Sequence, residues 1–299
     1  MSSQQVIILG YGFTGQALDR AFSSQGYETF GVRRNWSGKE DENAHSHPLE
    51  ADITAPDSLQ SLPEDADILV NCVSSGSRGD PERYRSVYYE GSRNLLDWAQ
   101  SKNFKMIAWT GSSSVYGKRN GAWVDESSDL QPDSKAAEIL VETEELYRDA
   151  YENQDMPTVL FRVTGIYGPG RTRSFRKFRG GNVHLSLEEA NYYMNMIHRT
   201  DIGRAVTTVA EDPRLGETFN LVDNEPITRR KFYVWLSQKL DKPLPEISGG
   251  TSTQSTNKRV SNDKFIKTYD FEFEYPTFRE GYGEIIEQDD FTINSRSKE

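Results

Sequence analysis

Three glycines near the start of the sequence have the spacing of a phosphate-binding turn. Gly10, Gly12 and Gly15 directly follow the apolar run 6–9, which predicts a buried strand, and a helical pattern follows them. Such a turn offers backbone N–H groups and the positive end of a helix dipole to a phosphate. The alternative is a glycine-rich turn that binds no ligand. The residues expected to contact a dinucleotide here are Gly10, Tyr11, Gly12, Phe13, Thr14 and Gly15.

Two arginines stand where the second strand of such a unit is expected to end. In NAD-binding turns, an Asp or Glu about 20 residues after the glycines holds the ribose 2′-hydroxyl. This sequence has Arg33 and Arg34 at that place. Guanidinium groups attract a 2′-phosphate and bind it in bidentate fashion, so the pair favours NADP(H). The alternative is NAD, with both arginines as solvated surface residues.

Composition excludes several classes of protein. The formal net charge of -11 over 299 residues argues against a nucleic-acid-binding surface. The single cysteine, Cys72, gives neither a disulfide framework nor a cysteine-based zinc site, and the histidine spacing predicts no metal site. No signal-peptide pattern and no apolar run of about 18 residues is visible. We therefore expect a cytoplasmic protein that binds neither nucleic acid nor membrane.

Apolar runs alternate with helical periodicities through the first part of the chain. Strands are expected at 6–9, 29–32, 49–53, 68–73, 105–110 and 158–162, and helices after Gly15, at 81–101 and from Pro132 to 153. This alternation predicts an α/β fold, a Rossmann-type doubly wound parallel sheet with a small C-terminal substrate lobe.

The alternation stops near residue 165 and returns only in part. The basic segment 171–179 predicts an irregular loop and 248–256 a Ser/Thr-rich loop, whereas a helix at 201–210 and a strand at 218–222 resume the pattern. We predict that residues 1–165 plus about 195–224 form the NADP-binding Rossmann domain. About 166–194 and 225–299 would form the substrate-binding lobe.

Further motifs resemble those of the extended short-chain dehydrogenase/reductases, the group that contains nucleotide-sugar epimerases and dehydratases. They are Asp52-Ile53 and the runs 111–117, 167–170 and 197–201. The stretches 257–262 and 275–282 resemble an atypical nucleoside-diphosphate-sugar epimerase branch. The resemblance covers nearly the whole chain. It implies an oxidoreductase or epimerase-like activity on a sugar nucleotide or a related small carbonyl or hydroxyl substrate.

The resemblance also implies roles for residues by position. Asp52 and Ile53 would contact the adenine, and Ser74 and Ser75 would line the cofactor cleft. Ser112 matches the family's catalytic Ser/Thr. The residues that would face the substrate or run beside the nicotinamide are Ser113, Ser114, Thr164 and Tyr167.

The sequence departs from this family at the proton-transferring group. The family uses Tyr-x-x-x-Lys on one helix face, where the ammonium lowers the pKa of the phenol. Lys135 fits the lysine and would hold the nicotinamide ribose, but Gln131 occupies the tyrosine position. A carboxamide has no proton to exchange near neutral pH.

Two classes of function follow from this departure. In the first, the acid/base is relocated to Tyr116, Tyr167, Tyr88 or a group of the substrate lobe; the catalytic candidates are then Ser112, Lys135 and Tyr116. In the second, the protein binds NADP(H) as a sensor or scaffold without redox turnover.

A basic cluster lies where relatives build the substrate lobe. We expect Arg173 and Arg176 to bind a phosphate or diphosphate of the substrate; the alternative is a solvated loop. The stretch 258–262 would either close over the same pocket or dock the C-terminal lobe. The apolar faces of the helices at 81–101 and 133–153 are compatible with a homodimer interface as well as with a core.

Overall fold

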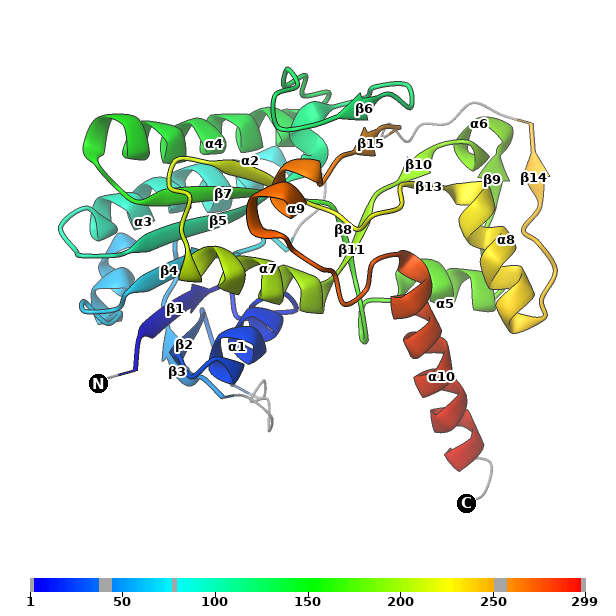
Figure 1. Ribbon diagram of the computed structural model, residues 1–299, viewed down its shortest axis with the longest axis horizontal. Coiled ribbons are helices and arrows are strands. Elements are labelled where there is room, and N and C mark those ends of the chain that lie inside the picture. The colour runs from blue at the N-terminus through cyan, green and yellow to red at the C-terminus, as the bar shows by residue number, and fades with distance from the viewer. Residues whose placement is uncertain (1–2, 38–44, 77–79, 250–256, 297–299) are drawn as a thin grey trace.

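A seven-stranded parallel sheet organises the protein (Figure 1). The computed structural model describes residues 3–37, 45–76, 80–249 and 257–296. The strand order reverses between β1 and β4, which is where ligands bind in doubly wound sheets. The predicted α/β class is therefore confirmed. In spatial order the strands are β12 (Thr218–Leu221), β7 (Thr158–Val163), β5 (Met106–Ser112), β4 (Ile68–Asn71), β1 (Gln5–Leu9), β2 (Glu28–Arg33) and β3 (His47–Glu50).

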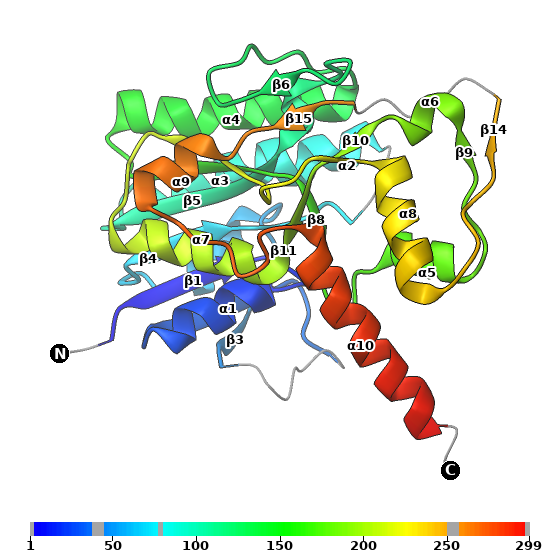
Figure 2. The same cartoon turned by 45° about the vertical axis from the view of Figure 1, so that its right-hand side comes forward.

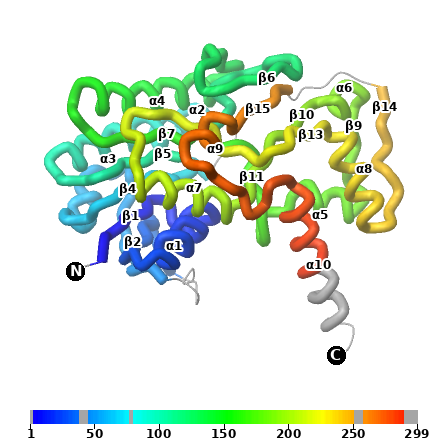
Figure 3. The backbone as a smooth tube through the Cα atoms, in the orientation of Figure 1, coloured from blue at the N-terminus to red at the C-terminus, as the bar shows by residue number. Residues whose placement is uncertain are grey.

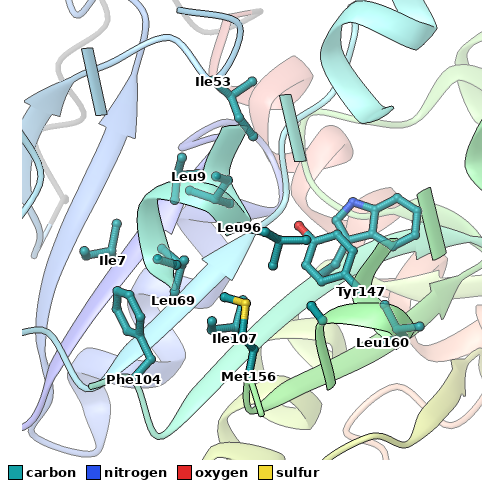
Figure 4. Close-up of a cluster of buried hydrophobic side chains, with 14 of the residues drawn as sticks. Ile7, Leu9, Ile53, Leu69, Leu96, Phe104, Ile107, Tyr147, Met156 and Leu160 are labelled. Atoms are coloured by element: carbon teal, nitrogen blue, oxygen red, sulfur yellow. The ribbon is translucent and has the colours of Figure 1, made fainter. Parts of the chain in front are cut away.

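Helices cover both faces of the sheet (Figure 2). On one face, α1 (Gly15–Ser24) and α7 (Arg199–Glu211) pack together over side chains that include Phe22 and Val206. On the other face, α3 (Gly91–Ala99) and α4 (Lys135–Gln154) cover the cluster drawn in Figure 4. That cluster includes Leu96 of α3, Tyr147 of α4 and Ile107 of β5. The central strands are buried on both faces, which explains their almost continuous apolar sequence.

Some element boundaries differ from the predictions. Helix α4 begins at Lys135 rather than at Pro132, because the Ser134 hydroxyl caps it by accepting the Ala137 N–H at 3.2 Å. The expected helix 81–101 is three segments, α2 (Pro81–Tyr84), the π-helix η2 (Arg85–Glu90) and α3. Strand β3 ends at Glu50, so Asp52 and Ile53 lie in the loop before the 3₁₀ helix η1 (Pro56–Ser61).

The segment 171–179 is mostly helical, contrary to the irregular loop expected from its charges. Helix α5 (Arg173–Arg179) places Phe175 and Phe178 on one buried face, at a spacing of three residues. The two phenylalanines join the core of the C-terminal lobe. The cationic side chains lie on the remaining surface of this helix. These charged residues surround the two phenylalanines in the sequence, so the apolar face of the helix could not be recognised there.

The lobe lies beside the carboxyl ends of the strands (Figure 1). Its core packs Phe178 with Phe232 of α8 (Arg229–Leu240) and Phe278 of α10 (Phe278–Arg296). Its other elements are α6 (Leu187–Ala190) and the pairs β9 (Leu185–Ser186) with β14 (Ile247–Ser248), and β10 (Tyr193–Met194) with β13 (Ile227–Thr228). The predicted loop 248–256 lies mostly outside the described residues.

Part of the C-terminal segment returns to the sheet (Figure 3). β15 (Arg259–Val260) pairs with β6 (Trp123–Val124), and α9 (Asp263–Tyr269) packs Phe265 on Phe219 of β12. The buried Asp201 carboxylate accepts the N–H groups of Glu274 and Tyr275 at 2.8 and 3.0 Å. This segment is thereby fixed to the start of α7. The pair β8 (Gly165–Tyr167) and β11 (Met196–His198) links sheet and lobe.

A network built on a buried ion pair joins four elements of the sheet side. Arg162 of β7 donates from Nε and Nη2 to the Glu144 carboxylate of α4 at 2.8 and 2.7 Å. Its Nη1 donates at 2.8 Å to the hydroxyl of Tyr116, which in turn donates to Asn220 at 2.8 Å. All four residues are at most 2% exposed. Tyr116 belongs to the 3₁₀ helix η3 (Ser113–Tyr116), so the network anchors the turn that follows β5.

Breaking this network is expected to destabilise the protein strongly. Replacing Arg162 by Met leaves the Glu144 carboxylate buried without its bidentate partner, a change that costs about 3–5 kcal/mol. Arg148 is the matched control, because it contacts the same carboxylate at 2.6 Å from a partly exposed position. Arg148→Met should cost less than about 1 kcal/mol. Urea unfolding measures both; equal losses would contradict the assignment.

Candidate active site

A cleft of about 640 Å³ opens at the reversal of strand order. The glycine turn after β1 forms one wall, and the ends of β2 and β4 form the others. Ten of the residues predicted to contact the cofactor line it: Gly10, Tyr11, Gly12, Phe13, Thr14, Arg33, Arg34, Asp52, Ile53 and Ser74. Arg83, which the sequence analysis did not single out, also lines this cleft.

The three glycines of the turn differ in what an added Cβ would contact. Gly10 has a φ of +91°, and a Cβ there would lie 2.7 Å from the backbone of Cys72 and Val73. A Cβ on Gly15 would lie 2.6 Å from the Gly10 carbonyl oxygen. A Cβ on Gly12 would lie 3.8 Å from the Gly10 carbonyl oxygen, an ordinary contact, so the protein leaves room there. That space, at the start of α1, fits a dinucleotide pyrophosphate.

Three predicted cofactor residues do not line this cleft. Gly15 packs the helix against the turn, as just described. Ser75 is buried, and its N–H donates to the hydroxyl of Tyr88 at 3.3 Å. Lys135 is exposed and pairs with Glu138 at 2.8 Å.

Arg33 is held in place by the glycine turn itself. Its Nε donates to the Tyr11 carbonyl oxygen, and its guanidinium carbon lies 4.9 Å from the ring centre of Trp36 and 5.7 Å from that of Tyr11. Arg34 is exposed at the cleft. Both cations therefore lie where the adenosine half of a dinucleotide would extend along β2.

A second cleft, of about 590 Å³, lies between the sheet and the lobe. Arg171 lines both clefts, so the two are adjacent. Of the predicted substrate residues, Arg176 is not among those that line it. The predicted residues that do line it are Ser112, Ser113, Ser114, Thr164, Tyr167 and Arg173.

The second cleft is strongly basic although the protein is acidic. None of the described residues that line it is an Asp or a Glu. Such a wall attracts an anion, and arginine in particular binds phosphate oxygens. The cationic residues that line it are Arg171, Arg173, Lys177, Arg229 and Lys258. Arg229 had no signal in the sequence, since it lies outside every recognised motif.

Comparison with known proteins places the chain in a family. Residues 6–221 match the model of the NAD dependent epimerase/dehydratase family. The chain belongs to this family. The resemblance noted in the sequence is thus confirmed.

Individual family members are distant in sequence but similar over nearly their full length. Protein YeeZ of Escherichia coli K12 is 25% identical over 280 residues, which are 91% of this chain and 97% of YeeZ. A provisionally assigned NAD-dependent epimerase/dehydratase from Methylobacillus flagellatus is 26% identical with a TM-score of 0.77, covering 96% of this chain and 99% of its own. The UDP-glucuronic acid 4-epimerase of Bacillus cereus, solved with UDP-glucuronic acid and NAD, shares the fold with a TM-score of 0.78 at 17% identity, covering 93% of this chain and 96% of its own.

The structure does not bring Tyr116 to either cleft. The side chain is fully buried in the Arg162 network, and burial raises the pKa of its phenol to about 12. Tyr167 does line the second cleft, but its hydroxyl donates to the Thr277 carbonyl at 3.4 Å and burial raises its pKa. Tyr88 lines a smaller neighbouring cleft together with Ser112.

Neither a metal cluster nor a membrane-spanning helix is found in the described parts of the chain. There, no group of three or more His, Cys, Asp or Glu side chains could hold a metal ion. No helix among these residues has the length and apolarity that crossing a membrane requires. Burial raises the pKa of the Cys72 thiol to about 12, so the thiol stays protonated near neutral pH.

The glycine geometry predicts two different defects. Gly12→Ala should leave thermal stability unchanged and weaken binding of NADPH or NADH at least about tenfold, because the added methyl fills the space for the pyrophosphate. Gly15→Ala should instead destabilise the protein by about 1–3 kcal/mol, because its Cβ meets the Gly10 carbonyl. Nucleotide fluorescence titrations and thermal melts separate the two. A Gly12→Ala protein with native affinity would refute the assigned pyrophosphate position.

Proposed function

We propose that this chain is an NADP(H)-dependent oxidoreductase or epimerase that acts on a sugar nucleotide or a related small carbonyl or hydroxyl substrate. The observation that carries the proposal is the basic second cleft, which meets the dinucleotide cleft at Arg171. A sugar nucleotide presents a diphosphate to such a wall and a sugar hydroxyl to the serines after β5. Membership of the NAD dependent epimerase/dehydratase family supports this substrate class.

The preference for NADP(H) rests on Arg33 and Arg34. The interaction of Arg33 with the Tyr11 carbonyl and the Trp36 ring orients one guanidinium before any ligand binds. Preorganised donors of this kind bind phosphate with little loss of side-chain entropy. NAD is the alternative cofactor, and relatives of the same fold have been solved with it.

The chain's own residues would orient the reactants. When bound, the cofactor supplies or accepts a hydride at its nicotinamide ring. Ser112 lines the second cleft and would hold the reacting oxygen of the substrate, with Ser113 and Ser114 beside the sugar. A role for Lys135 at the nicotinamide ribose requires that its ammonium leave the ion pair with Glu138.

A second candidate function has an observation in its favour. Gln131 stands at the family's tyrosine position, Tyr116 is buried, and Lys135 points to solvent. The tyrosine–lysine pair that transfers the proton in the family is therefore not assembled. The protein would then be an NADP(H)-binding sensor or scaffold. Mixing it with NADP or NADPH and a panel of UDP- and dTDP-sugars, and following the nicotinamide absorbance, decides between the two. Binding without turnover of any sugar favours the sensor.

We also propose a cellular location and an oligomeric state. The chain would work in the cytoplasm, as its sequence suggests. It would also form a homodimer through the helices expected at 81–101 and 133–153, which correspond to α2, η2 and α3, and to α4. Their apolar side chains, Leu95 and Tyr147 among them, pack in the core, so such an interface would use the outer surfaces of these helices.

Removing the two arginines should change cofactor preference. We expect Arg34→Ala and Arg33→Ala each to weaken NADPH binding about 10- to 100-fold, the effect of a lost charge-assisted hydrogen bond, and NADH binding less than about twofold. The matched control is Arg20→Ala, an exposed arginine of α1 that does not line the cleft. Equal losses for NADPH and NADH would contradict the 2′-phosphate role.

The phase of helix α5 predicts that only one of two neighbouring arginines binds the substrate. Arg173 lines the second cleft, whereas Arg176 does not. With UDP as a diphosphate probe, Arg173→Ala should weaken binding about tenfold and Arg176→Ala should leave it unchanged. Titration calorimetry measures both. A larger effect at Arg176 would place the diphosphate elsewhere.

A further inference from the structure

Lys258 is a buried cation without an anionic partner. The residue is 3% exposed, and its Nζ donates at 3.1 Å to the carbonyl oxygen of Gly117. Within the described residues, no carboxylate forms an ion pair with this nitrogen, and the charge of Asp133 acts on it only from beyond ion-pair distance. Burying an unpaired ammonium is costly, and lysine is almost never found fully buried unless it is paired. A role in packing alone would therefore be a costly use of this residue.

The backbone around Lys258 is held rigidly. β15 follows it directly and pairs with β6, so that Arg259 lies opposite Trp123 (Figure 1). The Asn195 side chain donates to the Lys258 carbonyl at 2.9 Å and accepts the N–H of Val260 at 2.8 Å. The side chain is therefore aimed from a fixed point, as positioned catalytic groups require.

One residue, Gly117, separates the ammonium from the backbone of Gln131, which stands at the family's tyrosine position. Its acceptor, Gly117, packs directly on Gln131, since a Cβ on Gly117 would lie 1.8 Å from the Gln131 carbonyl oxygen. Lys258 also lines the same cleft as Ser112 and Ser114. The three residues thus bring a hydroxyl and an amine to one wall, next to the place that lacks a phenol.

We propose that Lys258 is the group that exchanges the proton with the substrate in place of the missing tyrosine. This inference rests on the proposed function. In the direction of alcohol oxidation, the neutral amine takes the hydroxyl proton of the substrate while the hydrogen on the adjacent carbon leaves as hydride to NADP. The products are a carbonyl, the Lys258 ammonium and NADPH, so atoms and charge balance. The reverse reduction uses the ammonium as acid.

The titration of Lys258 suits this task. Burial lowers its pKa from 10.5 to about 8; Asp133 raises it and Arg119 lowers it further. Both protonation states are then populated near neutral pH, which is what a general acid/base needs. The charged groups that line the cleft with it are all cationic, and the other titratable groups there are phenols. They are Arg171, Arg173, Lys177 and Arg229, with Tyr167, Tyr193, Tyr233 and Tyr282.

The competing role for a lysine in this wall is a fixed charge that holds the diphosphate. Two substitutions separate the roles. Lys258→Arg keeps the charge but cannot deprotonate, and Lys258→Met removes both the charge and the amine. Proton transfer predicts that both variants lose about 10²–10⁴-fold in kcat. A fixed charge predicts that Lys258→Arg keeps kcat and that Lys258→Met raises KM.

The experiment uses the full chain with NADP or NADPH and a panel of UDP- and dTDP-sugars. The matched control is Lys267→Met, an exposed lysine of α9 outside both clefts. NADPH affinity should stay within about twofold for every variant, which shows that the cofactor site is intact. For the wild type, kcat for oxidation should rise with pH through about 8 and then level off.

A second readout does not depend on turnover. The rate at which Lys258 reacts with an amine-acylating reagent, mapped by mass spectrometry across pH, reports its protonation directly. A midpoint near pH 8 supports the inference. A midpoint at the ordinary lysine value of 10.5, or full kcat in Lys258→Arg, overturns it while the proposed function stands. A wild-type protein that binds NADPH yet turns over no sugar nucleotide overturns the proposed function, and the inference with it.

Discussion

The close approach of backbone to backbone at the end of β1 is the constraint on which the rest of the structure depends. Gly10 lies against the backbone that follows β4, and Gly15 lies against Gly10. The same kind of contact continues outward, because a Cβ on Gly203 of α7 would lie 2.5 Å from the Ala17 carbonyl of α1. Asp201, two residues before Gly203, holds the backbone of the C-terminal segment. A turn shaped for phosphate is thus connected through two helices to the substrate side.

Arg162 and Lys258, two deeply buried cations among the described residues, differ in the chemistry of their partners. Arg162 has a bidentate carboxylate, so its charge is neutralised and its position fixed. The Lys258 ammonium donates to a carbonyl oxygen and not to a carboxylate, and the residue lines an open cleft. The first kind of site stabilises a turn, and the second remains available to a ligand. Burial alone does not distinguish the two; the identity of the partner does.

Much of the sheet and the cofactor turn could be predicted from the sequence, because both depend on short-range patterns. Apolar runs located the strands within a few residues, and the glycine spacing located the cleft. Helix α5 was missed because only Phe175 and Phe178 mark its buried face among many charges. For the same reason, Arg173 and Arg176 could not be told apart, since their difference depends on the phase of a helix that was not expected.

The catalytic side was less predictable because its contacts are distant in sequence. Tyr116 follows Ser112 closely and looked available, yet Arg162 and Asn220, 46 and 104 residues away, bury its hydroxyl. The acceptor of Lys258 is 141 residues from it. Periodicity and local motifs carry no information at such separations. The sequence did indicate that the proton-transferring phenol is absent from its usual position, because Gln131 stands where the family has a tyrosine.

The late position of β15 in the chain has a consequence for biosynthesis. A ribosome completes all seven strands of the sheet and the glycine turn before it reaches Lys258 and Tyr282, which both line the second cleft. Domains generally begin to fold from the N-terminal side during synthesis. The nucleotide half can therefore take shape on a nascent chain that has no complete substrate half. Under the proposed function, cofactor capture would precede catalytic competence.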